Sequence, residues 1–159
     1  MYERILVPVD GSAAALRGLT EAMELAKGLN ASVRMLHVVD EFIPDMTLGP
    51  ANYYDNWIDA VRERGKTILR EALDYAKERG GKPEAVLMDT YGRRAADVII
   101  EQAAQWPADL IVMGTHGRRG MRRLLMGSDA ELVLRGTPVP VLMVRESGDA
   151  GTEKTKTNP

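Results

Sequence analysis

The chain has 159 residues, 45% of them apolar and 28% charged, and a formal net charge of −2. This length fits one domain with a single core, and the near-neutral charge provides no overall field that would attract DNA or an acidic membrane. The sequence contains no cysteine, which excludes disulfides, thiol catalysis and thiolate metal sites.

The first residues of the chain lack the long apolar core of a signal peptide. No apolar run approaches the ~18 residues that a membrane span needs. We therefore expect a cytoplasmic protein without a membrane segment.

Short apolar runs alternate along the chain with segments whose apolar residues recur at helical spacing. The first run, 4–9, leads into residues 10–12, where Ser12 is expected to cap a helix that stops at Gly28 and Asn30. Further strands are predicted over 33–39, 85–88, 109–113 and 139–144, and further helices over 58–80 and 128–135. Another helix is predicted to carry Ala95, Val98, Ile99 and Gln102 on one face.

Two segments carry no such pattern. Residues 40–56 contain Pro44, Gly49 and Pro50 without a clear period, and we predict a long loop there, of a kind that is often functional. Residues 146–159 hold almost nothing apolar, so we expect a disordered C-terminal tail after a domain that spans 1–145.

The predicted strands are apolar throughout rather than alternating, which is typical of a parallel sheet covered on both faces. We predict a single α/β domain of Rossmann-like architecture, with a five-stranded parallel sheet in the order 3-2-1-4-5 and helices on both faces. Ligands of such sheets bind beyond the carboxyl ends of the strands, where the strand order reverses. Asp10, Asp40 and Gly114 fall at strand ends, and this order makes the first and fourth strands neighbours.

The segment after the fourth predicted strand is rich in glycine and arginine. Gly114, Gly117 and Gly127 are spaced by two and nine residues, and Ser128 follows directly. A strand, a glycine loop and a helix N-terminus in this order offer N–H groups and a positive dipole to an anion. We expect Gly114 to let a ligand approach without a Cβ in the way, so that a bulky residue at Gly114 or Gly127 blocks the site and leaves the fold intact. A tight surface loop without a ligand is the alternative.

These segments resemble the universal stress protein family over nearly all of residues 2–145. The likeness lies in Arg-Ile-Leu-Val-Pro-Val-Asp-Gly-Ser (4–12), Leu-His-Val-Val (36–39), Ala-Asp-Leu-Ile-Val-Met-Gly-Thr-His-Gly (108–117), Gly-Ser (127–128) and Thr-Pro-Val-Pro-Val-Leu-Met-Val (137–144). The G-x2-G-x9-G-(S/T) spacing marks the branch of that family that binds ATP.

The resemblance implies a nucleotide site and a dimer. By this resemblance, the ribose and phosphates would be contacted by Gly114, Gly117, Gly127 and Ser128. The adenosine end would be lined by Pro8, Val9, Asp10, Val38 and Met113. The family pairs through its last strand, here Val139–Val144, which implies a homodimer.

Three residues near this motif have open roles. Asp129 departs from the family, where a small apolar residue often follows the Gly-Ser pair. We expect its carboxylate to point outward or to meet the Mg²⁺ that would accompany ATP. His116 is either a solvated loop residue or a phosphate contact, and Asp10 is either a turn residue or part of the site.

Other motifs have competing explanations. Residues 60–67 satisfy a relaxed P-loop pattern but lie inside a continuous helical period, so we expect no phosphate loop there. His37 lies in an apolar run and is expected to be a hydrogen-bonded core residue. With two histidines and no cysteine, a structural zinc site is not expected. The one basic cluster comprises Arg118, Arg119, Arg122 and Arg123, beside a GxxG sequence similar to the loop of KH RNA-binding domains.

These patterns lead to three hypotheses, of which we favour the first. It is a nucleotide-binding stress or signalling protein in which ATP, with Mg²⁺, shifts the loop or the dimer between states. The second is an ATP hydrolase or phosphoryl-transfer enzyme, slow at most because no general base stands out beyond Asp10, His116 and Asp129. The third is a nucleic-acid or protein-interaction module that uses the loop Arg118–Arg123.

Overall fold

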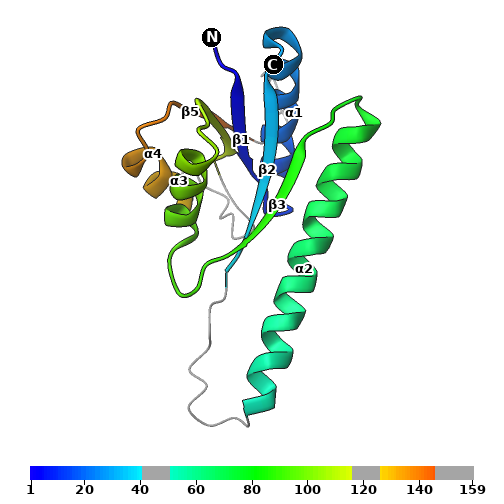
Figure 1. Cartoon of the computed structure of the whole chain (residues 1–159), viewed down its shortest axis with the longest axis vertical. Helices are drawn as coiled ribbons and strands as arrows, with labels where there is room; N and C mark the ends of the chain where they lie inside the picture. Colours follow the sequence, from blue (N-terminus) through cyan, green and yellow to red (C-terminus); the bar gives the residue numbers. More distant parts are fainter. Residues whose placement is uncertain (41–50, 116–125, 146–159) are drawn as a thin grey trace, which may run out of the picture.

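Five parallel strands form the middle layer of the structure, between two layers of helices (Figure 1). This computed structural model describes residues 1–40, 51–115 and 126–145 and, of residues 51–55, the backbone alone. The strands lie in the order β3-β2-β1-β4-β5. The predicted fold and strand order are therefore confirmed, while the predicted tail, 146–159, lies outside the described residues.

Strands and helices follow one another as the sequence predicts. In chain order they are β1 (Arg4–Pro8), α1 (Ala13–Leu29), β2 (Ser32–Val39), α2 (Ala51–Glu78), β3 (Glu84–Asp89), α3 (Ala95–Gln105), β4 (Leu110–Gly114), α4 (Ser128–Gly136) and β5 (Val141–Val144).

Residue types set both ends of α1. The Oγ atom of Ser12 accepts the N–H of Ala15 at 3.1 Å, which satisfies one of the donors that a helix start leaves open. Asn30 closes the helix in the left-handed conformation (φ 55°), and its N–H donates to the carbonyl of Ala26. Both predicted ends are confirmed.

The predicted loop 40–56 is wrong in its second part, because α2 begins at Ala51. Residues 41–50 lie outside the described residues. In Figure 1 the first turns of α2 extend past the ends of the strands. A helical turn with no sheet beneath it needs no apolar stripe, which is why the apolar period in the sequence starts only near Ile58.

The predicted strand 139–144 begins two residues late, at Val141. Pro140 has no N–H to give to a ladder, and the N–H of Val139 donates to Oγ1 of Thr137 at 3.1 Å. Regular pairing with β4 therefore starts at Val141, opposite Ile111.

Two apolar clusters fill the space on either side of the sheet. Ile5 and Val7 of β1 pack with α1 and α2, whereas Leu6 packs with α3 and α4. Because neighbouring side chains of a strand point to opposite faces, cluster membership shows which face each strand residue occupies.

The two sides of β1 end differently. The N–H of Val9 donates to the carbonyl of Leu36 on β2 at 2.8 Å, so the nitrogen of Pro8, one residue earlier, faces β4. Proline has no hydrogen there to donate. The register of β1 with β4 accordingly ends at Leu6 opposite Ile111, whereas that with β2 runs on to Pro8. The sheet is therefore least tied together between the carboxyl ends of β1 and β4.

Candidate functional site

The candidate site lies at the carboxyl ends of β1 and β4. Asp10 follows β1, and Gly114 is the last residue of β4. The two strands are neighbours in the sheet, and the chain runs outward from them in opposite directions, to β2 and to β5. This is the place where doubly wound sheets bind ligands.

Side-chain hydrogen bonds fix the turn between β1 and α1. Oδ1 of Asp10 accepts the N–H of Ser12 at 2.9 Å, and Oγ of Ser12 accepts the N–H of Ala15 at 3.1 Å. Gly11 between them has φ +81°, a conformation that glycine adopts without strain. The turn role considered for Asp10 is thus observed, and it holds the half-buried carboxylate at the sheet edge.

Gly114 is needed for packing against α1. A Cβ at this position would lie 2.8 Å from the carbonyl carbon of Ala14 and 2.9 Å from its Cβ. The missing side chain therefore faces α1, and the expectation that it opens a path for a ligand is corrected. A bulky residue here would collide with backbone, so the expectation of an intact fold is wrong for Gly114.

The start of α4 is tied to the end of β4. The N–H of Gly127 donates to the carbonyl of Thr115 at 2.8 Å, and the N–H of Thr115 donates to the carbonyl of Val144 at 2.9 Å. Gly127 is the N-cap of α4 and offers no side-chain hydrogen bond to the first turn. Ser128 and Asp129 are exposed in that turn. The predicted sequence of strand and helix N-terminus is confirmed, and the positive end of the α4 dipole lies beside β4.

The predicted adenosine-lining residues do not all share one face of the sheet. Val38 and Met113 pack with the cluster on the α3/α4 face. Val9, 3% exposed, belongs to the cluster on the α1/α2 face. Its side chain is therefore not brought together with the other two. Pro8, next to Val9, is half-buried at the end of β1.

Several predicted residues lie outside the described ones. They are His116, Gly117 and the arginines Arg118, Arg119, Arg122 and Arg123. The middle of the glycine motif and the basic cluster therefore receive no structural test.

A cleft of about 280 Å³ lies beside Asp10, between the β1–α1 turn and α2. Its lining residues are Asp10, Gly11, Arg64, Thr67, Ile68 and Glu71. Sequence reasoning missed the α2 residues because they come from a separate helix, and no local signal connects them to the turn.

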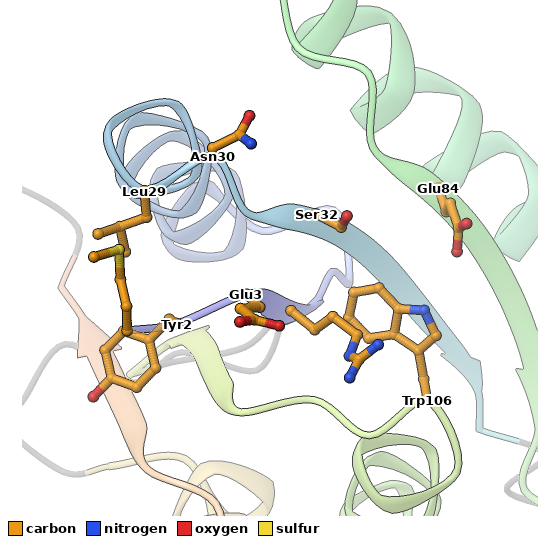
Figure 2. Close-up of a pocket in the computed structure, with 9 residues that line it drawn as sticks. Tyr2, Glu3, Leu29, Asn30, Ser32, Glu84 and Trp106 are labelled. Atoms are coloured by element: carbon orange, nitrogen blue, oxygen red, sulfur yellow. The ribbon is translucent and has the colours of Figure 1, made fainter.

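A trough of about 550 Å³ lies at the opposite end of the sheet, where β1, β2 and β3 begin (Figure 2). Arg34 stacks over the ring of Trp106 at 4.4 Å and pairs with Glu84 at 2.6 Å. The N–H groups of Glu3 and Arg4 donate to the carboxylate of Asp109 at 2.8 and 3.0 Å. The bonds to Asp109 anchor the start of the chain. The trough lies at the opposite end of the strands from the carboxyl ends where ligands bind in such folds.

The structure rules out one competing motif, the P-loop pattern at 60–67. Residues 60–67 lie in the middle of α2, so they form no phosphate loop. Gly65 within them packs against β2 and β3, since a Cβ there would lie 2.9 Å from Cδ2 of His37 and 3.1 Å from Cδ1 of Leu87.

Among residues 1–40, 51–115 and 126–145, no group of three or more His, Asp or Glu side chains could hold a metal ion. In the same ranges, no helix combines the length and apolarity of a membrane crossing.

Comparison with known proteins agrees with this fold. The model of the universal stress protein family matches residues 1–145. The chain belongs to the universal stress protein family.

Individual members of the family show the same likeness. A universal stress protein of Methanocaldococcus jannaschii is 34% identical over 146 residues, which cover 92% of this chain and 84% of the relative. The structure of the universal stress protein UspA from Lactobacillus plantarum superposes with a TM-score of 0.76 at 29% identity, over 91% of this chain and 98% of the other. That of a universal stress protein from Archaeoglobus fulgidus in complex with dAMP has a TM-score of 0.62 at 26% identity, over 90% and 98%. Relatives of this fold thus include one solved with an adenine nucleotide.

Proposed function

We propose that this universal stress protein binds ATP at the carboxyl ends of β1 and β4 and acts as a nucleotide-dependent stress or signalling protein in the cytoplasm. One observation carries the proposal. The start of α4 is bonded to the end of β4 beside the tip of β1, where strand pairing between β1 and β4 has already ended at Leu6. The G-x2-G-x9-G-S motif and the dAMP complex of a relative support the same ligand class.

Each part of the nucleotide has a group suited to it. The first N–H groups of α4 suit the phosphates, because the N-cap residue Gly127 gives them no side-chain hydrogen bond and the helix dipole adds positive potential. Gly114, Gly117 and Ser128 are assigned to the ribose and phosphates with them. On the α3/α4 face the half-buried Val38 offers an apolar surface to the adenine, and Met113, 6% exposed, belongs to the same apolar cluster.

Mg²⁺ would accompany the triphosphate. This ion is usually held by substrate phosphates, water and one or two carboxylates rather than by a cage of side chains. The described residues contain no such cage, and the exposed carboxylate of Asp129 in the first turn of α4 is the group that could join the phosphates. When bound, the ion neutralises phosphate charge that the acidic first turn would otherwise repel.

We expect nucleotide-free protein to bind ATP in calorimetry and to become more stable. At a ligand concentration of 100 times Kd, binding adds about 2.7 kcal/mol to stability. This corresponds to a rise of roughly 5–10 °C in the melting temperature of a domain of this size. Mass spectrometry of the purified protein identifies any adenine nucleotide carried from the cell.

A folded protein that shows neither heat of binding nor a shift in melting temperature at millimolar nucleotide would contradict the proposal. Phosphate release measures hydrolysis, which we expect to be slower than about one turnover per second, below the usual kinase range.

We also propose a homodimer that pairs through Val139–Val144. β5 is the last strand of the sheet, with β4 on one side. Leu142 on this strand is 38% exposed, and Leu134 on the adjoining α4 is 44% exposed. An apolar edge strand of this kind is a template for pairing with another chain.

Replacing Leu142 with glutamate should convert the dimer to a monomer in sedimentation velocity. Burial of an unpaired carboxylate is strongly unfavourable, and we expect association to weaken about 100-fold or more. Tyr91→Glu is the matched control, because Tyr91 is 73% exposed on the loop after β3 and lies at the far side of the sheet from β5. A dimer that survives Leu142→Glu would place the interface elsewhere.

A further inference from the structure

His37 is a buried polar residue close to the candidate site. It lies on β2, two residues before the end of the strand, and is 7% exposed. Its Nδ1 lies 2.7 Å from the carbonyl oxygen of Val9. A carbonyl accepts and never donates, so Nδ1 must carry the hydrogen of this bond. The predicted hydrogen-bonded core histidine is confirmed, and its partner is the tip of β1.

The tip of β1 depends on β2 for its position. Val9 donates its N–H to the carbonyl of Leu36 at 2.8 Å and accepts the Nδ1 hydrogen of His37 at 2.7 Å. On the other side, Pro8 has no hydrogen to offer β4, and pairing with β4 has ended at Leu6. Of these two hydrogen bonds between Val9 and β2, the His37 side chain therefore provides one.

The imidazole ring is itself held from behind by α2. A Cβ on Gly65 would lie 2.9 Å from Cδ2 of the ring, and 3.1 Å from both Cγ2 of Val39 and Cδ1 of Leu87. Glycine inside a helix costs about 1 kcal/mol relative to alanine, and here it makes room for the ring. The ring is thus confined between α2 and the end of β1.

The residue after Val9 is Asp10, whose carboxylate fixes the N–H of Ser12 and so the start of α1. We propose that His37 is a positioning residue of the nucleotide site: its Nδ1–H holds the Val9 carbonyl and thereby sets the place of Asp10 and the β1–α1 turn. His37 touches no ligand in this proposal, which rests on the proposed function.

The test compares three variants by nucleotide titration at a temperature where each is folded. His37→Asn keeps an N–H donor at the same number of bonds from the backbone, whereas His37→Leu removes it. Met35→Ala is the matched control, since Met35 lies two residues earlier on the same face of β2 and is fully buried. We expect His37→Leu to bind ATP about tenfold more weakly, the factor that one hydrogen bond is worth. We expect His37→Asn to recover most of that loss.

Met35→Ala should lower the melting temperature and leave the affinity of the folded protein unchanged. A loss of affinity in His37→Leu alone would then not be explained by a general loss of stability. Amide hydrogen exchange supplies a second measure, with faster exchange at Gly11 and Ser12 in His37→Leu and not in Met35→Ala. If His37→Leu does not fold, His37→Gln, whose donor lies one bond further out, takes its place.

Equal affinity in wild type and His37→Leu, or no recovery in His37→Asn, would overturn the positioning role. A folded wild-type protein that binds no adenine nucleotide would overturn the proposed function instead, and with it the ligand-directed part of this inference. Exchange at Gly11 and Ser12 that is unchanged in His37→Leu would overturn the structural part as well.

Discussion

Replacing Gly114 with alanine is expected to destabilise the fold by about 3 kcal/mol, at the upper end of what overpacking usually costs. The added Cβ would lie 2.8 Å from the carbonyl carbon of Ala14 and 3.0 Å from its oxygen. Because both atoms belong to the backbone of the first turn of α1, relief requires the helix to move away from β4. A movement there also shifts the β1–α1 turn, so nucleotide binding should fall together with stability.

Urea unfolding measures this change, and Gly28→Ala provides the matched control. Gly28 lies in the last turn of α1, and a Cβ there would meet nothing within 4 Å. Alanine should therefore stabilise the helix at this position by up to about 1 kcal/mol. If Gly114→Ala unfolds within about 0.5 kcal/mol of wild type, the range of ordinary surface changes, the packing role of Gly114 is refuted.

Replacing Gly127 with aspartate is expected to weaken ATP binding about 100-fold without loss of stability. Gly127 is the N-cap of α4 with φ −61° and ψ 148°, a conformation open to any residue. Aspartate is a good N-cap, so the helix should be as stable as before or slightly more so. Its carboxylate would accept hydrogen bonds from the N–H groups that we propose to bind the phosphates. It would also repel the phosphates, and like charges in contact cost several kcal/mol.

Gly127→Asn separates charge from occlusion. Asparagine has nearly the same size and capping ability as aspartate but carries no charge. Calorimetry with ATP on both variants should show a smaller loss for asparagine, and the difference measures the electrostatic repulsion. Full affinity in Gly127→Asp would mean that the phosphates bind away from α4.

Glycines within one motif have different roles in this chain. Gly114 is required by the close approach of a helix, and Gly65 in the false P-loop pattern is required by the ring of His37. Gly127 instead leaves a helix start without a side-chain cap. A spacing pattern treats these residues alike, because it records where a side chain is missing but not what lies opposite.

Two errors in element boundaries, at the start of α2 and at the start of β5, have local causes that the sequence does not display. The apolar period of α2 begins where the helix meets the sheet, so residues 51–56 read as loop although they are helical. The apolar run at 139–144 reads as one strand, yet pairing starts only after Pro140. In both cases the hydrophobic pattern follows apolar side chains, whereas the element is defined by backbone hydrogen bonds.

Short sequence patterns were enough to predict the alternation of strands and helices, the caps of α1 at Ser12 and Asn30, and the family. The forces behind these features act over one or two turns of chain, through short-range hydrogen bonds and the periodicity of burial. Contacts between distant segments decided the rest: the side of the sheet that Val9 occupies, the need for glycine at position 114 and the bond from His37 to the tip of β1. Such contacts depend on which strands become neighbours and which helix lies over them, and no single stretch of this chain contains both partners.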